Sequence, residues 1–281
     1  MTGPPTTQIS TRGLSVSYDG HPILTDVDLD IRGGELVVLV GPNGAGKTTL
    51  LGVLSGDVDP SGGKVTLDDK PLASYAAREL ARKRAVQLQK QGLAFGFRVH
   101  EVVRMGRSPW HRTEREDDDD RVVAESMERA DVTDLGDRLY PTLSGGEQAR
   151  TSFARLLAQE TPVLMLDEPT AALDIRHQES LLAVARSAAQ AGAAVVVVLH
   201  DLSLAAAYAD RICVLSHGRV RANGSPTDVL TSELLTEVYE HPVEVITHDG
   251  NLLVVPVRSR VTAQTSTETE EVRCATPWPH A

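Results

Sequence analysis

The sequence predicts an α/β fold in which a mixed, mostly parallel sheet carries an antiparallel β subdomain and a helical insertion. Residues 36–40 are uniformly apolar, which is typical of a buried parallel strand, whereas the strand-like runs at 13–18 and 23–31 alternate with a period of two. Residues 91–160 are mostly helical in pattern, and beyond them apolar strands and amphipathic helices alternate again. Together these observations predict a sheet-based core that is interrupted by a helical subdomain.

The remaining elements follow from the same periodicities, taken in chain order. Strands are expected at residues 64–67, 163–166 and 193–199, and hairpins at 211–222 and 243–257. Helices are expected at residues 75–84, 99–105, 114–130, 147–159, 175–190, 202–209, 226–230 and 232–239. Beyond residue 260 the chain is rich in Thr, Ser and Glu without an apolar period. We therefore expect one domain over residues 1–260 and a disordered tail over 261–281.

Composition narrows the class of protein. An apolar fraction of 41% in 281 residues supports a substantial core, and a formal net charge of −11 argues against a nucleic-acid partner. The chain has no run of eighteen apolar residues, and its first residues lack the basic and apolar parts of a signal peptide. Its two cysteines lie far apart in the sequence and predict neither a disulfide framework nor a metal site. These features predict a cytoplasmic setting.

Residues 41–49 read Gly-Pro-Asn-Gly-Ala-Gly-Lys-Thr-Thr, which is a complete G-x-x-x-x-G-K-[ST] phosphate-binding loop. The apolar strand before it and the helix-forming stretch after it distinguish it from a glycine-rich turn that happens to carry a lysine. The glycines let backbone N–H groups surround phosphate oxygens at a helix N-terminus. Lys47 can reach the β- and γ-phosphates, and Thr48 can offer its hydroxyl to Mg²⁺. The residues expected to bind a nucleoside triphosphate are Gly41, Pro42, Asn43, Gly44, Ala45, Gly46, Lys47, Thr48 and Thr49.

A second stretch, Val-Leu-Met-Leu-Asp-Glu at residues 163–168, ends an apolar strand in two carboxylates. Because ligands of α/β sheets gather at the carboxyl ends of strands, we expect Asp167 to hold Mg²⁺, directly or through water. Glu168 points differently and is suited to polarise an attacking water as a general base. Taken alone, the pattern equally suits a strand that ends in a solvated acidic turn. Together with the phosphate loop it predicts nucleotide hydrolysis.

Residues 143–148, Leu-Ser-Gly-Gly-Glu-Gln, open a helix. Ser144 is a favourable N-cap, and Gly145 and Gly146 expose backbone N–H groups at the helix start, so the stretch predicts a second anion site. The LSGGE sequence resembles the signature of ABC-transporter ATPases, in which two subunits sandwich two ATP molecules. Each signature there closes on the γ-phosphate held by the opposite phosphate loop. The resemblance covers about residues 8–240 and implies a RecA-like mixed sheet core.

The resemblance implies roles for further residues. Tyr18 would stack on adenine, although its position also suits a tyrosine of an edge strand. Gln89 would touch Mg²⁺ and the attacking water, with Gln87 as the rival assignment. Asp174 lies in the loop that communicates across the dimer, and His200 would contact the γ-phosphate. The implied catalytic residues are Glu168, His200, Gln89 and Lys47, and the implied Mg²⁺ ligands are Thr48, Gln89 and Asp167.

Two regions resemble one group of ABC proteins in particular. The sequence of residues 93–97 and 101–110 is similar to that of the ATPases of iron-siderophore, cobalamin and haem importers. The sequence of residues 243–246 and 252–256 is most similar to that of the haem (hemin) branch of this group. The resemblance implies an ATPase subunit that powers haem import. A ferric-siderophore or cobalamin importer is the alternative, and an exporter is a more distant one.

The same resemblance implies partners. Two copies of the chain would close on ATP beneath two permease subunits at the cytoplasmic face of the membrane, and a substrate-binding protein would act indirectly. Residues 89–110 would form the groove that accepts the permease. The expected apolar contacts are Phe95, Phe97, Val102, Val103 and Met105, and the expected polar anchors are Arg98, Arg104 and Arg107. Alternatively, roughly half of the apolar side chains pack inside the helical subdomain.

Overall fold

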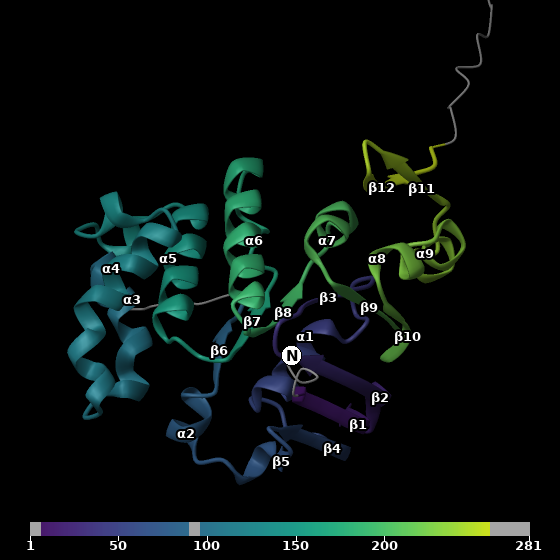
Figure 1. Ribbon diagram of the computed structural model, residues 1–281. Helices are drawn as coiled ribbons and strands as arrows, with labels where there is room; N and C mark the ends of the chain where they lie inside the picture. The colour runs from purple at the N-terminus through teal and green to yellow at the C-terminus, as the bar shows by residue number, and fades with distance from the viewer. Residues whose placement is uncertain (1–6, 90–95, 259–281) are drawn as a thin grey trace, which may run out of the picture.

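A computed structural model describes residues 7–89 and 96–258, and these residues place a six-stranded sheet at the centre of the molecule (Figure 1). The strand order is β10-β9-β3-β8-β7-β6, with β10 antiparallel to β9 and every other neighbouring pair parallel. The strands are β3 (Leu36–Val40), β6 (Arg84–Gln87), β7 (Val163–Asp167), β8 (Ala194–Val198), β9 (Arg211–Ser216) and β10 (Arg219–Gly224). The carboxyl ends of β3, β6, β7 and β8 therefore meet at one edge of the sheet.

A second sheet is fully antiparallel, in the order β2-β1-β4-β5. Its strands are β1 (Thr7–Tyr18), β2 (His21–Arg32), β4 (Gly62–Leu67) and β5 (Lys70–Pro71). The period-two alternation predicted for the first two strands buries Leu14 and Val16 on β1 against Leu24 and Val27 on β2. Helix α1 (Lys47–Ser55) packs between this sheet and the central one.

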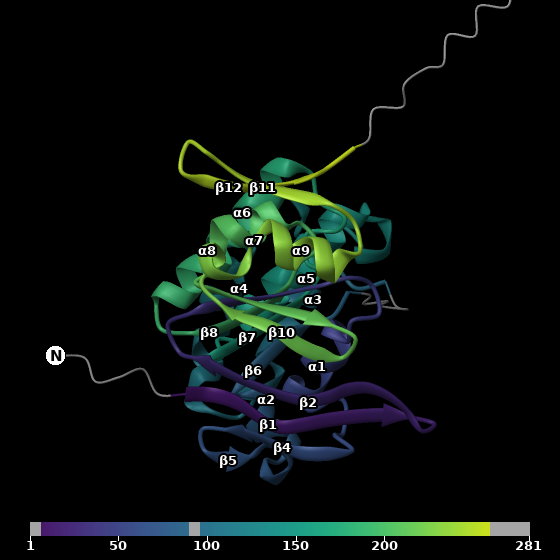
Figure 2. The same ribbon diagram turned by 90° about the vertical axis from the view of Figure 1, so that its right-hand side faces the viewer.

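The apolar run 36–40 is explained by burial on both faces of β3. Val37 and Leu39 belong to a core cluster shared with α1 and the antiparallel sheet, whereas Val38 and Val40 belong to the cluster shared with the helices. Figure 2 shows the resulting layers, with β1 and β2 on one side of the central strands and α6 and α7 on the other. The expected mixed sheet core with an antiparallel subdomain is confirmed.

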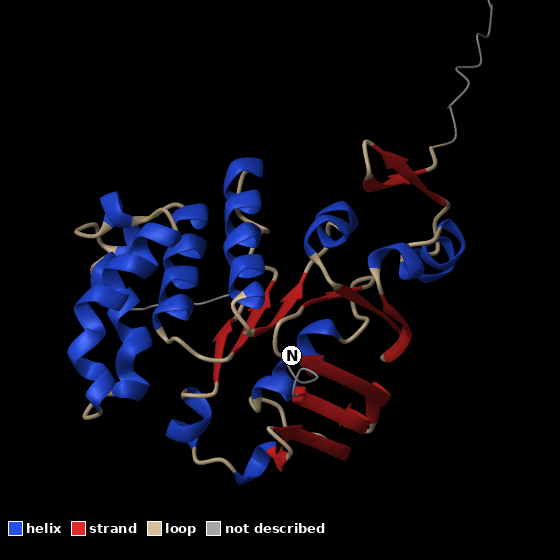
Figure 3. Cartoon of the chain, viewed as in Figure 1, coloured by secondary structure: helices blue, strands red, loops and turns tan. Residues whose placement is uncertain are grey.

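The helices after β6 fall into two groups along the chain, and both groups contribute buried side chains to one core cluster with the central strands (Figure 3). Between β6 and β7 the chain forms α3 (Val99–Arg104), α4 (Asp119–Arg129), α5 (Gly145–Ala158) and the 3₁₀ turns η2 (Met105–Trp110), η3 (Glu114–Asp118), η4 (Thr133–Leu135) and η5 (Tyr140–Thr142). Beyond β7 lie α6 (Ile175–Gln190), α7 (Leu202–Tyr208), α8 (Pro226–Val229), α9 (Ser232–Tyr239) and the hairpin β11 (Val243–His248) and β12 (Asn251–Pro256). No helix of the described residues is long and apolar enough to span a bilayer.

The prediction of a helix over residues 75–84 is wrong in extent. After the 3₁₀ turn η1 (Leu72–Ser74), helix α2 spans Ala77–Ala81 alone, and Arg84 already begins β6. Strand β6 pairs with β7 from Arg84 opposite Val163 to Gln87 opposite Leu166. Alanine and arginine favour a helix locally, but pairing at the edge of the sheet overrides that propensity.

The predicted single helix over 114–130 is also wrong at its start, because η3 precedes α4. The side chain of Arg107 bonds on both sides of this break: Nη2 donates to the Arg115 carbonyl at 2.9 Å and Nε to Asp119 Oδ1 at 2.6 Å. A tertiary contact thus fixes a change of helix type that the local sequence does not signal. The expected tail over 261–281 lies outside the described residues.

Candidate functional site

The phosphate loop joins β3 to α1, and two of its glycines have a conformation that excludes a side chain. Gly41 has φ +147, and a Cβ there would lie 2.1 Å from the Leu215 carbonyl oxygen. Gly46 has φ +97, and a Cβ there would lie 2.6 Å from the side chain of Leu24. The residues between them turn the chain into the first turn of α1, which contains Thr48 and Thr49. The loop therefore presents the N-terminus of α1, which is an anion-binding geometry.

Lys47 is held inside the loop, with 6% of its surface exposed. Its Nζ donates to the carbonyl oxygens of Gly41 at 2.8 Å and Pro42 at 3.0 Å. Burial lowers the pKa of Lys47, and the nearby carboxylates of Glu168 and Asp167 oppose that shift. The ammonium group of Lys47 is thus poorly hydrated. Its two hydrogen bonds to carbonyl oxygens can be replaced by hydrogen bonds to an anion.

Asp167 is the last residue of β7 and is 2% exposed. Thr48, at the start of α1, donates from Oγ1 to Asp167 Oδ1 at 3.4 Å. Burial raises the pKa of Asp167, and the hydrogen bond from Thr48 opposes that shift. A hydroxyl and a carboxylate side by side are the oxygen donors that Mg²⁺ prefers, so these residues fit that ion.

Glu168 is clamped between two polar side chains that reach it from distant parts of the chain. His200 Nε2 lies 2.5 Å from Glu168 Oε1, and Gln89 Nε2 donates to Glu168 Oε2 at 2.5 Å. Glu168 has φ +48, a backbone conformation uncommon for residues other than glycine, and its N–H donates to the Val198 carbonyl. Glu168 and Gln89 border a cavity of about 360 Å³ that also reaches Asp167. Such a left-handed residue at a strand end suits a group that must point into a site.

The structure places Gln89, and not its rival Gln87, against Glu168. Gln87 is buried within β6 and donates from Nε2 to the Ala149 carbonyl at 3.2 Å. The end of the strand explains the difference, because Gln87 is the last paired residue of β6, whereas Gln89 lies beyond the strand end and reaches Glu168.

Asp201 holds the turn next to His200 and was not identified from the sequence. It follows His200 and caps helix α7, since its Oδ1 accepts from the N–H groups of Ser203 at 2.8 Å and Leu204 at 3.0 Å. The cap fixes the turn that carries His200 from β8 to α7. An aspartate directly before a helix-forming stretch was the available signal.

The residues 144–146 form a well-defined helix start. Ser144 accepts from the Glu147 N–H at 3.3 Å while Glu147 accepts from the Ser144 N–H at 2.7 Å, which is a capping box on α5. Gly146 lies against the Ala172 carbonyl, where a Cβ would approach to 3.0 Å. Among the described residues, no hydrogen bond or ion pair joins residues 144–146 to the phosphate loop.

Two further predicted residues occupy exposed positions. Asp174 caps α6, with its Oδ1 accepting from the His177 N–H at 3.0 Å, and that hydrogen bond lowers the pKa of Asp174. Tyr18 ends β1 with 51% of its surface exposed, so its ring is free to stack on a planar ligand. The structure therefore brings together Lys47, Thr48, Asp167, Glu168, His200 and Gln89. Gly145 lines the cavity beside Glu168, whereas Tyr18 and Asp174 do not line it.

The stretch expected to accept a permease is partly internal. Val102 and Val103 are buried in the core of the helical subdomain, whereas Phe97 and Met105 are half-buried. Phe95 and its neighbours in 90–95 lie outside the described residues. The alternative that about half of these apolar side chains pack internally fits the described ones.

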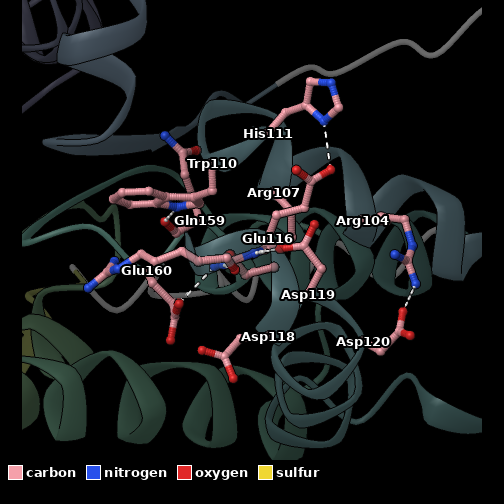
Figure 4. A network of polar contacts seen from close by, with 12 residues as sticks. Arg104, Arg107, Trp110, His111, Glu116, Asp118, Asp119, Asp120, Gln159 and Glu160 are labelled. Atoms are coloured by element: carbon pink, nitrogen blue, oxygen red, sulfur yellow. Dashed lines mark hydrogen bonds and ion pairs between the residues drawn. The ribbon is translucent and has the colours of Figure 1, made fainter. Parts of the chain in front are cut away.

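The prediction that Arg107 is an exposed polar anchor for the permease is wrong, because only 1% of its side chain is exposed (Figure 4). Besides Asp119, its guanidinium donates to Glu160 Oε2 at 2.7 Å and to the Ala158 carbonyl at 3.0 Å. The neighbouring Trp110 donates from Nε1 to the Gln159 carbonyl at 2.8 Å. The network ties η2 to the end of α5. A guanidinium with five donors is suited to such an internal junction, because it bonds several carbonyls and carboxylates at once.

Replacing Arg107 by methionine should lower the free energy of unfolding by about 3 kcal/mol, because Asp119 would be left in a half-buried place without its cation. Equilibrium unfolding in urea measures this loss. The matched control is Arg104→Met, whose ion pair with Asp120 is exposed and should be worth less than about 1 kcal/mol. Equal losses in the two variants would contradict the internal role of Arg107.

The geometry defines a class of protein. A phosphate loop, a strand-end aspartate and a clamped glutamate on a mixed sheet form the site of a P-loop ATPase. A family model described as "ABC transporter" matches residues 24–171, and the chain belongs to this family. It is accordingly an ATPase that binds ATP and couples its hydrolysis to transport.

Relatives and solved structures agree with this assignment. Two proteins named "Hemin import ATP-binding protein HmuV", from Rhodococcus jostii (strain RHA1) and Thermobifida fusca (strain YX), are 57% and 53% identical to the chain. The matches cover 88% and 90% of this chain and 86% and 90% of those proteins. A dimeric post-hydrolysis structure of the ATP-binding cassette MJ0796 with ADP and Pi has a TM-score of 0.71 at 26% identity, covering 78% of this chain and 98% of that one.

Proposed function

We propose that this chain is the ATP-binding and ATP-hydrolysing subunit of a hemin importer. The observation that carries the ATPase part is the convergence of Lys47, Asp167 and Glu168 at one edge of the sheet. The cargo is proposed from the relatives at 57% and 53% identity, whose name specifies hemin import. A transporter described as metal-chelate type, in an inward-facing conformation, has a TM-score of 0.75 at 26% identity over 90% of this chain and 98% of that one, which supports the same group.

Thr48, Asp167 and Gln89 would hold Mg²⁺, directly or through water. The ion would shield the charge of the β- and γ-phosphates when bound. Lys47 would turn from the carbonyls of Gly41 and Pro42 to the phosphate oxygens. The backbone N–H groups of residues 41–49 would receive the same phosphates, with Tyr18 against adenine.

Glu168 would act as the general base that orients and polarises the attacking water. His200 and Gln89 already contact its two carboxylate oxygens. When a γ-phosphate enters, His200 would turn to it, and Gln89 would turn to the water and Mg²⁺. The carboxylate would then be free to accept the proton of the water.

A second copy of the chain would complete the site. Because residues 144–146 have no bond to the phosphate loop of their own chain among the described residues, their exposed helix start is available to an ATP held elsewhere. In the proposed homodimer this helix start closes on the γ-phosphate of the partner, and Asp174 lies in the loop between the two sites.

Two permease subunits would dock on residues 89–110 of the two copies. Among the predicted contact residues that the structure describes, those that retain exposed surface are Phe97, Arg98, Arg104 and Met105. We place the chain at the cytoplasmic face of the membrane, as one ABC domain over residues 1–260 with a helical subdomain at 91–160. A substrate-binding protein would act through the permease.

The test is ATP hydrolysis by the chain in liposomes with its permease and with a substrate-binding protein that carries haem. We expect the haem-loaded binding protein to stimulate hydrolysis, and the empty one to do so less. Stimulation by a ferric siderophore or cobalamin complex instead would reassign the cargo within the same group. Hydrolysis that ignores all three complexes would overturn the importer proposal and leave the ATPase assignment in place.

A further inference from the structure

A cavity of about 590 Å³ lies between the antiparallel sheet and β6, the edge strand of the central sheet. Its walls come from the end of α1, from β4, from η1 and α2, and from the first residue of β6. Figure 1 shows α2, β4 and β5 together at the bottom of the view. Small-molecule sites have volumes of about 300–1,000 Å³, so this cavity is large enough to be one. None of its lining residues belongs to the phosphate loop.

Most of the cavity wall is apolar. Val53, Val65 and Leu72 are buried there, and other apolar side chains of the wall are half-buried. The hydroxyl of Tyr75 already donates to the Leu67 carbonyl at 2.7 Å, so its hydrogen-bonding capacity is used within the wall. The larger apolar and aromatic lining side chains are Val53, Val58, Val65, Leu72, Tyr75 and Leu80. A molecule in the cavity would therefore meet hydrocarbon on most of its surface.

Arg84 is the charged exception in this wall, with 17% of its side chain exposed. Its Nη2 lies 3.5 Å from Asp57 Oδ1, which is longer than the usual hydrogen bond of about 2.7–3.2 Å. Its Nε is buried without a hydrogen-bond partner. Within the described part of the chain, the guanidinium thus has one long ion pair and no hydrogen bond.

The state of Arg84 differs from that of the other deeply placed arginine, Arg107. The Arg107 guanidinium donates to Asp119, to Glu160 and to two carbonyl groups. Such bonding is usual, because a buried polar group without a partner is costly. Burial lowers the pKa of Arg84, and the charge of Asp57 opposes that shift. Arg84 has therefore lost water without gaining hydrogen-bond acceptors from the protein.

The other charged side chains of the wall are well hydrated. Asp57, Asp59 and Lys64 are all exposed to solvent. Asp57 also accepts a 2.7 Å hydrogen bond at Oδ2 from the Ser55 hydroxyl, which ties it to the end of α1. Arg84 is accordingly the charge of this wall that gains most from an added acceptor, and its sign calls for an anion.

We propose that this cavity binds a small molecule with an apolar body and a single carboxylate, which accepts hydrogen bonds from the Arg84 guanidinium. The apolar body lies against the side chains of α1, β4 and α2, and the carboxylate points toward the start of β6. The site goes beyond the proposed function, because it shares no residue with the ATP site. It assigns a role to an arginine that the sequence motifs do not include.

The test compares octanoate with octan-1-ol by isothermal titration calorimetry, because the two probes share a hydrocarbon chain and differ in charge. We expect the wild-type chain to bind octanoate about tenfold more tightly than octan-1-ol, since hydrogen bonds to a charged group are strong. Arg84→Met keeps an apolar side chain and removes the donors. This variant should bind octan-1-ol as the wild-type chain does and should lose the preference for octanoate.

Two further variants locate the site and control for charge. Ala77→Trp places a large ring in the wall, with Arg84 unchanged, and should weaken the binding of both probes. Arg12→Met removes an exposed arginine, paired with Asp30 outside the cavity, and should leave both affinities unchanged. Melting temperatures and the Kd for ATP, measured without either probe, should match those of the wild-type chain in every variant and show that each is folded.

Three results would overturn the inference. The first is a lack of octanoate binding by the wild-type chain. The second is an equal preference for octanoate in the wild-type chain and in folded Arg84→Met, which would exclude the guanidinium as the partner. The third is unchanged binding in Ala77→Trp, which would place the probe outside the cavity. Absence of ATP binding in the wild-type chain would instead contradict the proposed function, so the two failures are distinguishable.

Discussion

Replacing Glu168 by glutamine should leave ATP binding intact and reduce the rate of hydrolysis about a thousandfold. The amide has the shape of the carboxylate and still offers two polar atoms to His200 and Gln89, which lie 2.5 Å from the present oxygens. It has no capacity to accept a proton from water. The loss should therefore fall on kcat, because an interaction made only in the transition state has been removed.

Single-turnover hydrolysis and equilibrium ATP binding measure the two effects separately. Glu125→Gln is a control with the same chemical change, because Glu125 lies in an exposed ion pair with Arg121 on α4. This variant should leave both the hydrolysis rate and the affinity for ATP unchanged. We also expect Glu168→Gln to accumulate an ATP-bound dimer, visible by size-exclusion chromatography. Turnover near the wild-type rate would show that Glu168 is not the base.

The sequence predicts best those elements whose signals are local. Helices α6 and α9 begin and end where the periodicity places them, because each has an N-cap, Asp174 or Thr231, directly before an amphipathic run. Strand β3 is predicted from its uniform apolar character, which reflects burial on both faces. The meeting of Glu168 and His200 follows from the same logic, since neighbouring parallel strands end at one edge of a sheet.

Long-range contacts decide what the sequence does not reveal. The sequence predicts Arg107 as a surface anchor, because arginine is usually exposed. In the structure Asp119 and Glu160 form ion pairs with it from different parts of the chain, and these pairs make its burial favourable. Strand β6 is fixed by its pairing with β7, against its own propensity. Motifs identify the residues that would touch ATP, and packing identifies the residues that hold them in place.

Replacing Lys47 by alanine should weaken ATP binding roughly 10- to 100-fold, because a hydrogen bond to a charged group contributes about 1.5–3 kcal/mol. Lys47 carries the positive charge of the loop. Burial has removed water from its ammonium group, and phosphate oxygens would take the place of that water. Without the nucleotide its Nζ merely bridges two carbonyls of the same loop. The loss should therefore appear in the Kd for ATP itself, in contrast to the effect of Glu168→Gln.

Titration with a fluorescent ATP analogue measures the Kd, and the melting temperature without nucleotide shows whether the variant is folded. Lys70→Ala, on the exposed edge strand β5, is the control and should leave the Kd unchanged. Because the Lys47 ammonium is desolvated in the free protein, its removal should cost little stability even as affinity falls. A Kd for ATP equal to that of the wild-type chain would contradict the role of Lys47 and would shift the binding of the phosphates to the backbone N–H groups of the loop.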